Sequence, residues 1–131
     1  MTKVALVTGA SSGMGESTAI LLSKQGYKVY GAARRTDKMK ELEANGVSVI
    51  SLDITQDESI VKCVDTILKK EGRIDILINN AGITRDNLML RMSKDDWDTI
   101  IKVNLDSVFN LTKAVIKPMM KARNGSIINM T

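Results

Sequence analysis

The chain has 131 residues, of which 44% are hydrophobic and 26% are charged, so its composition is that of one folded globular domain and not of a disordered segment. A net charge of +4, an aromatic content of 3% and the absence of any apolar run of about 18 residues argue against nucleic-acid and membrane partners. One cysteine, Cys63, and no histidine leave no basis for a disulfide framework or a metal site. Because Met1-Thr2-Lys3 leads straight into a strand-like stretch with no signal peptide, we expect a reduced, cytoplasmic location.

Apolar runs alternate with amphipathic stretches along the whole chain. In chain order, the pattern predicts a strand over 4–7, a helix over 17–25, a strand over 28–33, a helix over 36–45, a strand over 47–52, a helix from a capping box at 55–58 to about 70, a strand over 74–78, a helix from Ser93 to about 122, and a strand over 126–130. Pro118 should kink or end the last helix. This alternation predicts a single α/β domain with a doubly wound, parallel, Rossmann-like sheet covered by helices on both faces.

A glycine-rich segment joins the first strand to the first helix. Its glycines at positions 9, 13 and 15 allow a sharp turn and a close approach of the backbone to a ligand. The free N–H groups at the start of the helix can then bind a phosphate. A glycine-rich turn without a ligand is the alternative, and the absence of a following Gly-Lys-Ser/Thr disfavours a nucleoside-triphosphatase loop.

The ends of the second and third strands carry the charged side chains of interest. The second strand ends in Ala32-Ala33-Arg34-Arg35, where enzymes that use NAD tend to place a carboxylate. Two guanidiniums and no carboxylate favour NADP over NAD, although two adjacent arginines can also be simple solvated charges. Asp53, after the third strand, can either accept a hydrogen bond from an adenine amino group or cap the next helix, for which Thr55 competes.

Two motifs together resemble the short-chain dehydrogenase/reductase family. They are Thr8-Gly9-x-x-x-Gly13-x-Gly15 after the first strand and Asn79-Asn80-Ala81-Gly82 after the fourth. From Asn79 to Met130 the sequence is most similar to the family's 3-oxoacyl-[acyl-carrier-protein] reductases, on the segments 80–88, Trp97, 103–105 and 127–129. The first 78 residues resemble a general member, which suggests the hypothesis of a chimera with its seam near the second motif.

The resemblance implies a strand order of 3-2-1-4-5 and a nicotinamide dinucleotide as partner. Arg34 would meet the 2′-phosphate of NADP, with Arg35 as support. Asn104 matches the family's catalytic asparagine, which holds the water and lysine of a proton relay, although a polar residue inside a helix can instead bond to a neighbouring backbone group. The other implied cofactor-binding positions are Gly9, Ser11, Ser12, Gly13, Met14 and Gly15 at the phosphates and adenine ribose, Asp53 and Ile54 beside the adenine, and Asn80, Ala81 and Gly82 on the ribose side.

The family's chemistry transfers a hydride from the nicotinamide to a carbonyl, with a serine and a Tyr-x-x-x-Lys pair as partners. This chain has only Tyr27 and Tyr30, followed four residues later by Gly31 and Arg34, and Thr131 stands about where the serine would follow. The resemblance therefore implies the NADP(H)-binding portion of a reductase of 3-oxoacyl or similar carbonyl substrates, incomplete relative to the family and not catalytic alone. A second polypeptide could complete it, and a truncated or engineered noncatalytic scaffold without a tight ligand is the alternative.

The implied order leaves the last strand at an edge of the sheet. We expect self-association through this strand, 126–130, because its outer N–H and C=O groups would be unpaired. Leu111, Val115 and Ile116 are the apolar side chains of the last helix expected to be exposed.

Overall fold

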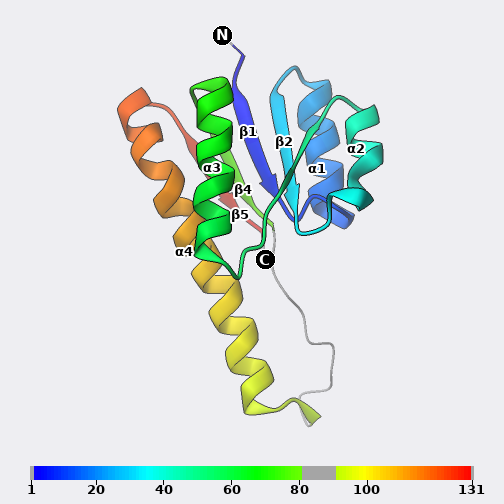
Figure 1. Ribbon diagram of the computed structural model, residues 1–131, viewed down its shortest axis with the longest axis vertical. Coiled ribbons are helices and arrows are strands. Elements are labelled where there is room, and N and C mark those ends of the chain that lie inside the picture. The colour runs from blue at the N-terminus through cyan, green and yellow to red at the C-terminus, as the bar shows by residue number, and fades with distance from the viewer. Residues whose placement is uncertain (1, 81–90, 131) are drawn as a thin grey trace.

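A parallel sheet of five strands forms the centre of the computed structural model, which describes residues 2–80 and 91–130 (Figure 1). The strand order is β3-β2-β1-β4-β5, and every neighbouring pair is parallel, which confirms the predicted fold class and topology. In chain order the elements are β1 (Val4–Thr8), α1 (Gly13–Lys24), β2 (Lys28–Ala33), the 3-10 helix η1 (Thr36–Met39), α2 (Lys40–Ala44), β3 (Ser48–Ser51), α3 (Asp57–Glu71), β4 (Ile76–Asn79), α4 (Lys94–Ala122) and β5 (Ser126–Asn129).

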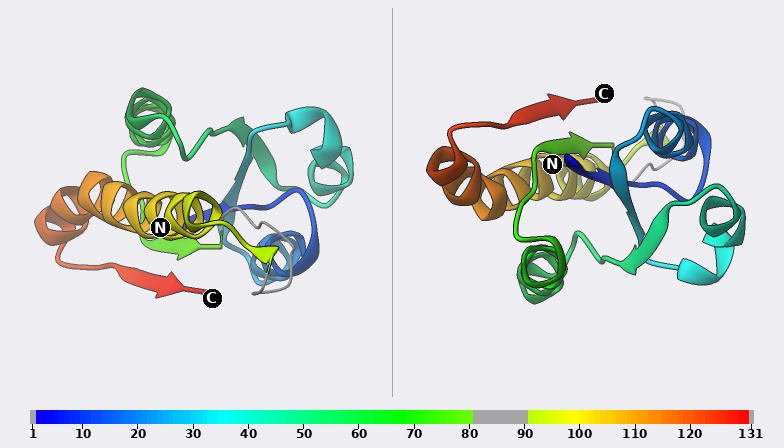
Figure 2. Two further views of the ribbon diagram at one scale, coloured as in Figure 1. Left: turned by 90° about the horizontal axis from the view of Figure 1, so that it is seen from below. Right: turned by 90° about the horizontal axis from the view of Figure 1, so that it is seen from above.

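Side chains of β1 alternate between two buried clusters, one on each face of the sheet. Val4 and Leu6 belong to a cluster that also contains residues of α3 and α4, whereas Ala5 and Val7 belong to one with residues of α1 and α2. Figure 2 shows the corresponding layers, with α3 and α4 on one side of the sheet and α1 on the other. Strands that are apolar on both faces are typical of a parallel sheet covered by helices.

Cys63 lies in the cluster formed with α3 and α4 and is 2% exposed. Burial raises the pKa of its thiol to about 12, so the thiolate is not populated near neutral pH. This residue packs as a small apolar side chain. Among residues 2–80 and 91–130, no helix combines the length and the apolar character that a membrane crossing requires.

One buried residue, Asp75, joins the amino ends of three strands through its carboxylate and its backbone. Asp75, which precedes β4, is 2% exposed and accepts bonds from the Val4 backbone N–H at 2.8 Å, from Arg73 at 2.7 and 2.6 Å, and from Asn124 Nδ2 at 2.8 Å. Its backbone C=O accepts the N–H of Ser126, the first residue of β5. Burial alone would raise the pKa of Asp75, but these hydrogen bonds and the charge of Arg73 outweigh it and hold that pKa below its ordinary value.

The predicted start is confirmed for α4 and wrong for α3. Ser93 caps α4, since its hydroxyl accepts the Asp96 N–H at 3.0 Å, as expected. The capping box at 55–58 is wrong, because α3 begins at Asp57 after Gln56 and the Thr55 hydroxyl donates to Asp53. The helix predicted over 36–45 is divided into η1 and α2, and α1 begins at Gly13, four residues before the predicted start.

Of the three apolar side chains of α4 that were expected to be exposed, only one is exposed. Leu111 and Val115 are 1% and 0% exposed, so that part of the prediction is wrong, whereas Ile116 is 42% exposed as expected. The buried stripe of α4 repeats every four residues from Ser107 to Met119 and faces the sheet. Pro118 does not end the helix, which continues to Ala122, and the next residue, Met119, is buried. Apolar side chains off this stripe are exposed: Trp97, Ile101, Leu105, Phe109, Ile116 and Met120.

Candidate functional site

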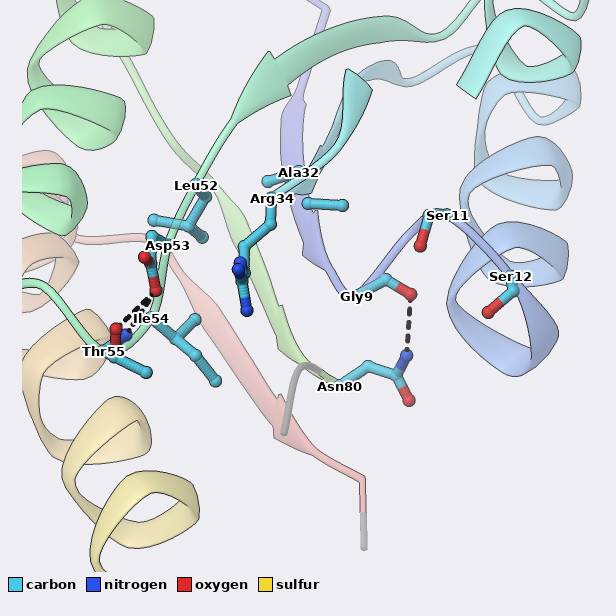
Figure 3. Close-up of a pocket in the computed structure, with 11 residues that line it drawn as sticks. Gly9, Ser11, Ser12, Ala32, Arg34, Leu52, Asp53, Ile54, Thr55 and Asn80 are labelled. Atoms are coloured by element: carbon cyan, nitrogen blue, oxygen red, sulfur yellow. Dashed lines mark hydrogen bonds between the residues drawn. The ribbon is translucent and has the colours of Figure 1, made fainter. Parts of the chain in front are cut away.

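A cleft of about 380 Å³ opens where the carboxyl ends of β1, β2 and β4 and the segment after β3 come together (Figure 3). Ligands of open α/β sheets bind in such a crevice, beside the strand from which the chain winds in both directions. Its volume lies in the range of pockets that hold small molecules. Its lining residues are Gly9, Ser11, Ser12, Ala32, Ala33, Arg34, Leu52, Asp53, Ile54, Thr55 and Asn80.

The loop between β1 and α1 has a shape that requires glycine. Gly9 and Gly13 have φ angles of 63° and 59°, in the left-handed region that other residues rarely adopt. A Cβ atom on Gly15 would lie 2.2 Å from the carbonyl oxygen of Gly9 and 2.5 Å from Asn80 Nδ2. The first turn of α1 therefore lies directly against the loop that follows β1 and against the residue that follows β4.

The N-terminus of α1 has the features of an anion-binding site. Ser12 is extended at φ −164° and ψ 170°, and its side chain makes no capping hydrogen bond. The first helical bond runs from Glu16 N–H to the Ser12 carbonyl, and a Cβ atom on Gly13 would contact nothing within 4 Å. The helix thus begins with N–H groups that no capping side chain satisfies and with open space in front, which fits a phosphate group.

Thr8 and Asn80 connect the glycine loop to the end of β4. The fully buried Thr8 hydroxyl accepts the Asn80 backbone N–H at 3.0 Å and donates to the Ile78 carbonyl at 3.3 Å. Asn80 Nδ2 donates to the Gly9 carbonyl at 3.2 Å, which is one of the dashed lines in Figure 3. Thr8 was not among the predicted site residues, although a polar residue at the end of a fully buried strand is a signal that could have identified it.

The two adjacent arginines after β2 have different surroundings. Arg34 lies in the cleft, whereas Arg35 is outside the lining and forms an exposed ion pair with Asp37 at 3.6 Å. Ala32 and Ala33 are the residues of β2 that line the cleft, so β2 presents no carboxylate there. Of the two arginines, only Arg34 lines the cleft.

Asp53 and Thr55 form a tight turn on the opposite wall of the cleft. Asp53 Oδ1 accepts both the Thr55 hydroxyl at 2.6 Å and the Thr55 backbone N–H at 3.0 Å. The Asp53 backbone N–H donates to Ser59 Oγ at 2.8 Å, which ties the turn to α3. The Thr55 hydroxyl, then its N–H, and to a smaller extent the charge of Arg34 hold the pKa of Asp53 below its ordinary value against the opposing effect of burial. Asp53 is therefore a carboxylate near neutral pH, and it does not cap α3.

Several predicted positions lie elsewhere. Met14 is 60% exposed, and Gly13 and Gly15 shape the loop without lining the cleft. Asn104 lies within α4, outside the lining, where its carbonyl accepts the hydroxyl of Ser107 at 3.0 Å. Ala81 and Gly82 lie outside the described residues. Four residues of the lining were not foreseen, namely Ala32 and Ala33 at the end of β2 and Leu52 and Thr55 in the segment that follows β3.

Comparison with known proteins gives a consistent result over the whole chain. The family model described as short chain dehydrogenase matches residues 3–131. The chain is 44% identical to the 3-oxoacyl-[acyl-carrier-protein] reductase of Thermotoga maritima and 47% identical to that of Vibrio cholerae, in each case over 98% of its own length. The chain spans about half the length of these curated relatives, 55% and 54% respectively. Because these relatives match both sides of the Asn79–Gly82 motif, the result counts against the hypothesis of two parents.

Comparison with solved structures gives the same result. A short-chain dehydrogenase from Streptomyces avermitilis superposes with a TM-score of 0.91 at 34% identity, over 98% of this chain and 48% of that one. A metagenomic short-chain oxidoreductase in complex with NADP superposes with a TM-score of 0.84, also at 34% identity, over 97% of this chain and 61% of that one.

Proposed function

The chain belongs to the short-chain dehydrogenase family, and from this premise we propose that it is the NADP(H)-binding portion of a carbonyl reductase. When bound, the cofactor would supply a hydride to the carbonyl carbon of a substrate. The names of the relatives at 44% and 47% identity support a 3-oxoacyl thioester as that substrate. The described residues supply the groups that hold the nucleotide.

The observation that carries the preference for NADP is the position of Arg34. Its side chain lines the cleft where β2 ends, and the two preceding residues are alanines, so no carboxylate there opposes a 2′-phosphate. A guanidinium can make two parallel, charge-assisted hydrogen bonds to a phosphate. The NADP complex of the structural neighbour at TM-score 0.84 supports the same cofactor.

The remaining contacts follow from the walls of the cleft. The N–H groups at the start of α1, with Ser11 and Ser12 beside them, would bind the pyrophosphate. On the opposite wall, Asp53 Oδ2, which takes no part in the two bonds from Thr55, would accept the adenine amino group, and Ile54 would pack on the ring.

Four further positions are included in the proposal by family resemblance. Asn80, which holds the Gly9 carbonyl, would lie on the ribose side together with Ala81 and Gly82. Asn104 would serve the proton relay of the complete reductase. No Tyr-x-x-x-Lys pair occurs in these 131 residues, so we propose that they bind the nucleotide without reducing a substrate by themselves.

The test is a fluorescence titration of the chain with NADPH and with NADH. NADPH should bind several-fold more tightly, and Arg34→Ala should weaken NADPH binding by about tenfold or more while leaving NADH unchanged. Arg35→Ala is the matched control, because Arg35 pairs with Asp37 outside the cleft, and it should behave as the unsubstituted chain. Absence of binding of both nucleotides at millimolar concentration would favour the alternative, a noncatalytic scaffold without a tight ligand.

A further inference from the structure

Two opposite charges face the same cleft without pairing. The charge of Arg34 contributes to the low pKa of Asp53, so the two groups are close enough to interact, yet they form no direct ion pair. Both side chains line the cleft (Figure 3). Opposite charges attract each other, so a contact that holds one of these side chains in place favours their separation.

The contact that holds Asp53 comes from Thr55. The hydroxyl and the backbone N–H of Thr55 both donate to the same oxygen, Asp53 Oδ1, at 2.6 and 3.0 Å. Two donors on one oxygen fix both the position and the rotation of the carboxylate. Ser59 holds the backbone of Asp53 but does not touch the carboxylate.

We propose that Thr55 is a positioning residue that keeps Asp53 apart from Arg34, so that the carboxylate is available to the adenine amino group and the guanidinium to the 2′-phosphate. This inference rests on the proposed function, because it assigns the adenine to the Asp53 carboxylate and the 2′-phosphate to the Arg34 guanidinium. Without the hydroxyl, the carboxylate keeps only the bond from the Thr55 backbone N–H and can rotate toward Arg34, which weakens the recognition of both the adenine and the 2′-phosphate. Base selectivity and phosphate selectivity are thereby linked through one hydroxyl group.

The experiment compares ratios of affinities, which a general loss of folding would not change. NADPH is compared with its hypoxanthine analogue, in which a carbonyl oxygen replaces the amino group and a carboxylate has no proton to accept. NADPH is also compared with NADH. Thr55→Val removes the hydroxyl and keeps the backbone N–H, and because Thr55 is exposed, the substitution leaves the core unchanged.

Thr55→Val should reduce both ratios, adenine over hypoxanthine and NADPH over NADH, by about three- to tenfold. Thr55→Ser retains a hydroxyl and should restore them. Ser59→Ala is the matched control, because it removes a bond to the Asp53 backbone only, and both ratios should stay unchanged. Unchanged ratios in Thr55→Val, with normal binding by the unsubstituted chain, would overturn this inference and leave the proposed function standing. Absence of nucleotide binding by the unsubstituted chain would instead overturn the proposed function, and this inference with it.

Discussion

Polar side chains at the two ends of the sheet differ in how fully they are paired. At the amino end, the carboxylate of Asp75 accepts four hydrogen bonds and is 2% exposed. At the carboxyl end, Asp53 receives two bonds on one oxygen, Arg34 makes no ion pair with it, and α1 begins without a side-chain cap. Groups that satisfy one another stabilise the fold, whereas groups left to solvent are available to a ligand. The comparison predicts that substitutions at the amino end change stability without changing binding, whereas substitutions at the carboxyl end change binding.

The largest expected effect is at the carboxyl end, at Gly15. Gly15→Ala places a Cβ atom 2.2 Å from the Gly9 carbonyl, so the loop must move. We expect nucleotide binding to be lost at millimolar concentration and the free energy of unfolding to fall by about 2 kcal/mol. Titration and urea denaturation measure both quantities.

Gly26→Ala is the control for that substitution, because Gly26 follows α1 at the other end of the sheet. Its φ angle is 95°, and an added Cβ atom would contact nothing within 4 Å. It should lower stability by about 1 kcal/mol through backbone strain alone and leave binding unchanged. Equal effects of the two substitutions on binding would contradict the distinction between the ends.

The next effect is at the amino end. Asp75→Asn removes the charge that Arg73 faces and replaces one acceptor oxygen by a donor, so it should lower the free energy of unfolding by about 2–3 kcal/mol. NADPH affinity of the folded protein should not change. Asp53→Asn is the corresponding substitution at the carboxyl end, and it should cause a much smaller loss of stability and a clear loss of NADPH affinity. A loss of affinity in Asp75→Asn and of stability in Asp53→Asn would show that the roles of the two ends are assigned wrongly.

A smaller effect concerns pH. The pKa of Asp75 in the folded chain lies below its ordinary value of 3.8, so its contribution to stability is complete above pH 3.8 and is lost as the pH falls through the folded pKa. Urea midpoints should therefore decrease below about pH 4. In Asp75→Asn this decrease should be shallower, with the part that remains coming from Asp53, whose pKa is also lowered. A parallel decrease in both proteins would exclude Asp75 as the cause.

The smallest expected effect is on the outer edge of β5, which runs between the two ends. Ile128 on this strand is 49% exposed, and β5 pairs only with β4 among the described strands. We expect weak self-association through residues 126–130, visible by light scattering at high micromolar concentration. Ile128→Lys should reduce it, because a charge disfavours pairing of one edge with another. A monomeric profile of the unsubstituted chain would contradict the prediction.

The sheet could be predicted because its signals are local and repeated. Runs such as Val4–Val7 and Ile74–Ile78 are too apolar for an exposed strand, and helix patterns separate them, so parallel pairing follows. The strand order came from the family resemblance and is confirmed. The position of the cleft followed from the glycines and from the strand ends that carry Arg34, Asp53 and Asn80.

The errors occur where two local interactions compete. The Thr55 hydroxyl can cap a helix or bond to Asp53, and in the folded turn it donates to Asp53. Apolar residues occur on more than one face of α4, so periodicity did not show that Leu111 and Val115 face the sheet while Ile116 does not. The sequence predicts that Arg34 meets the 2′-phosphate with Arg35 as support; in the structure Arg34 lines the cleft, whereas Arg35 pairs with Asp37.

The length of α4 has a mechanical consequence. All its buried residues lie between Ser107 and Met119, and no residue from Lys94 to Asp106 is buried, so the first part of the helix forms an arm that extends past the sheet (Figure 1). At a rise of about 1.5 Å per residue this arm is about 20 Å long. A rotation of about 5° around the packed part would displace its tip by about 2 Å. A small rotation of the packed part of α4 therefore produces a larger displacement at the start of the helix.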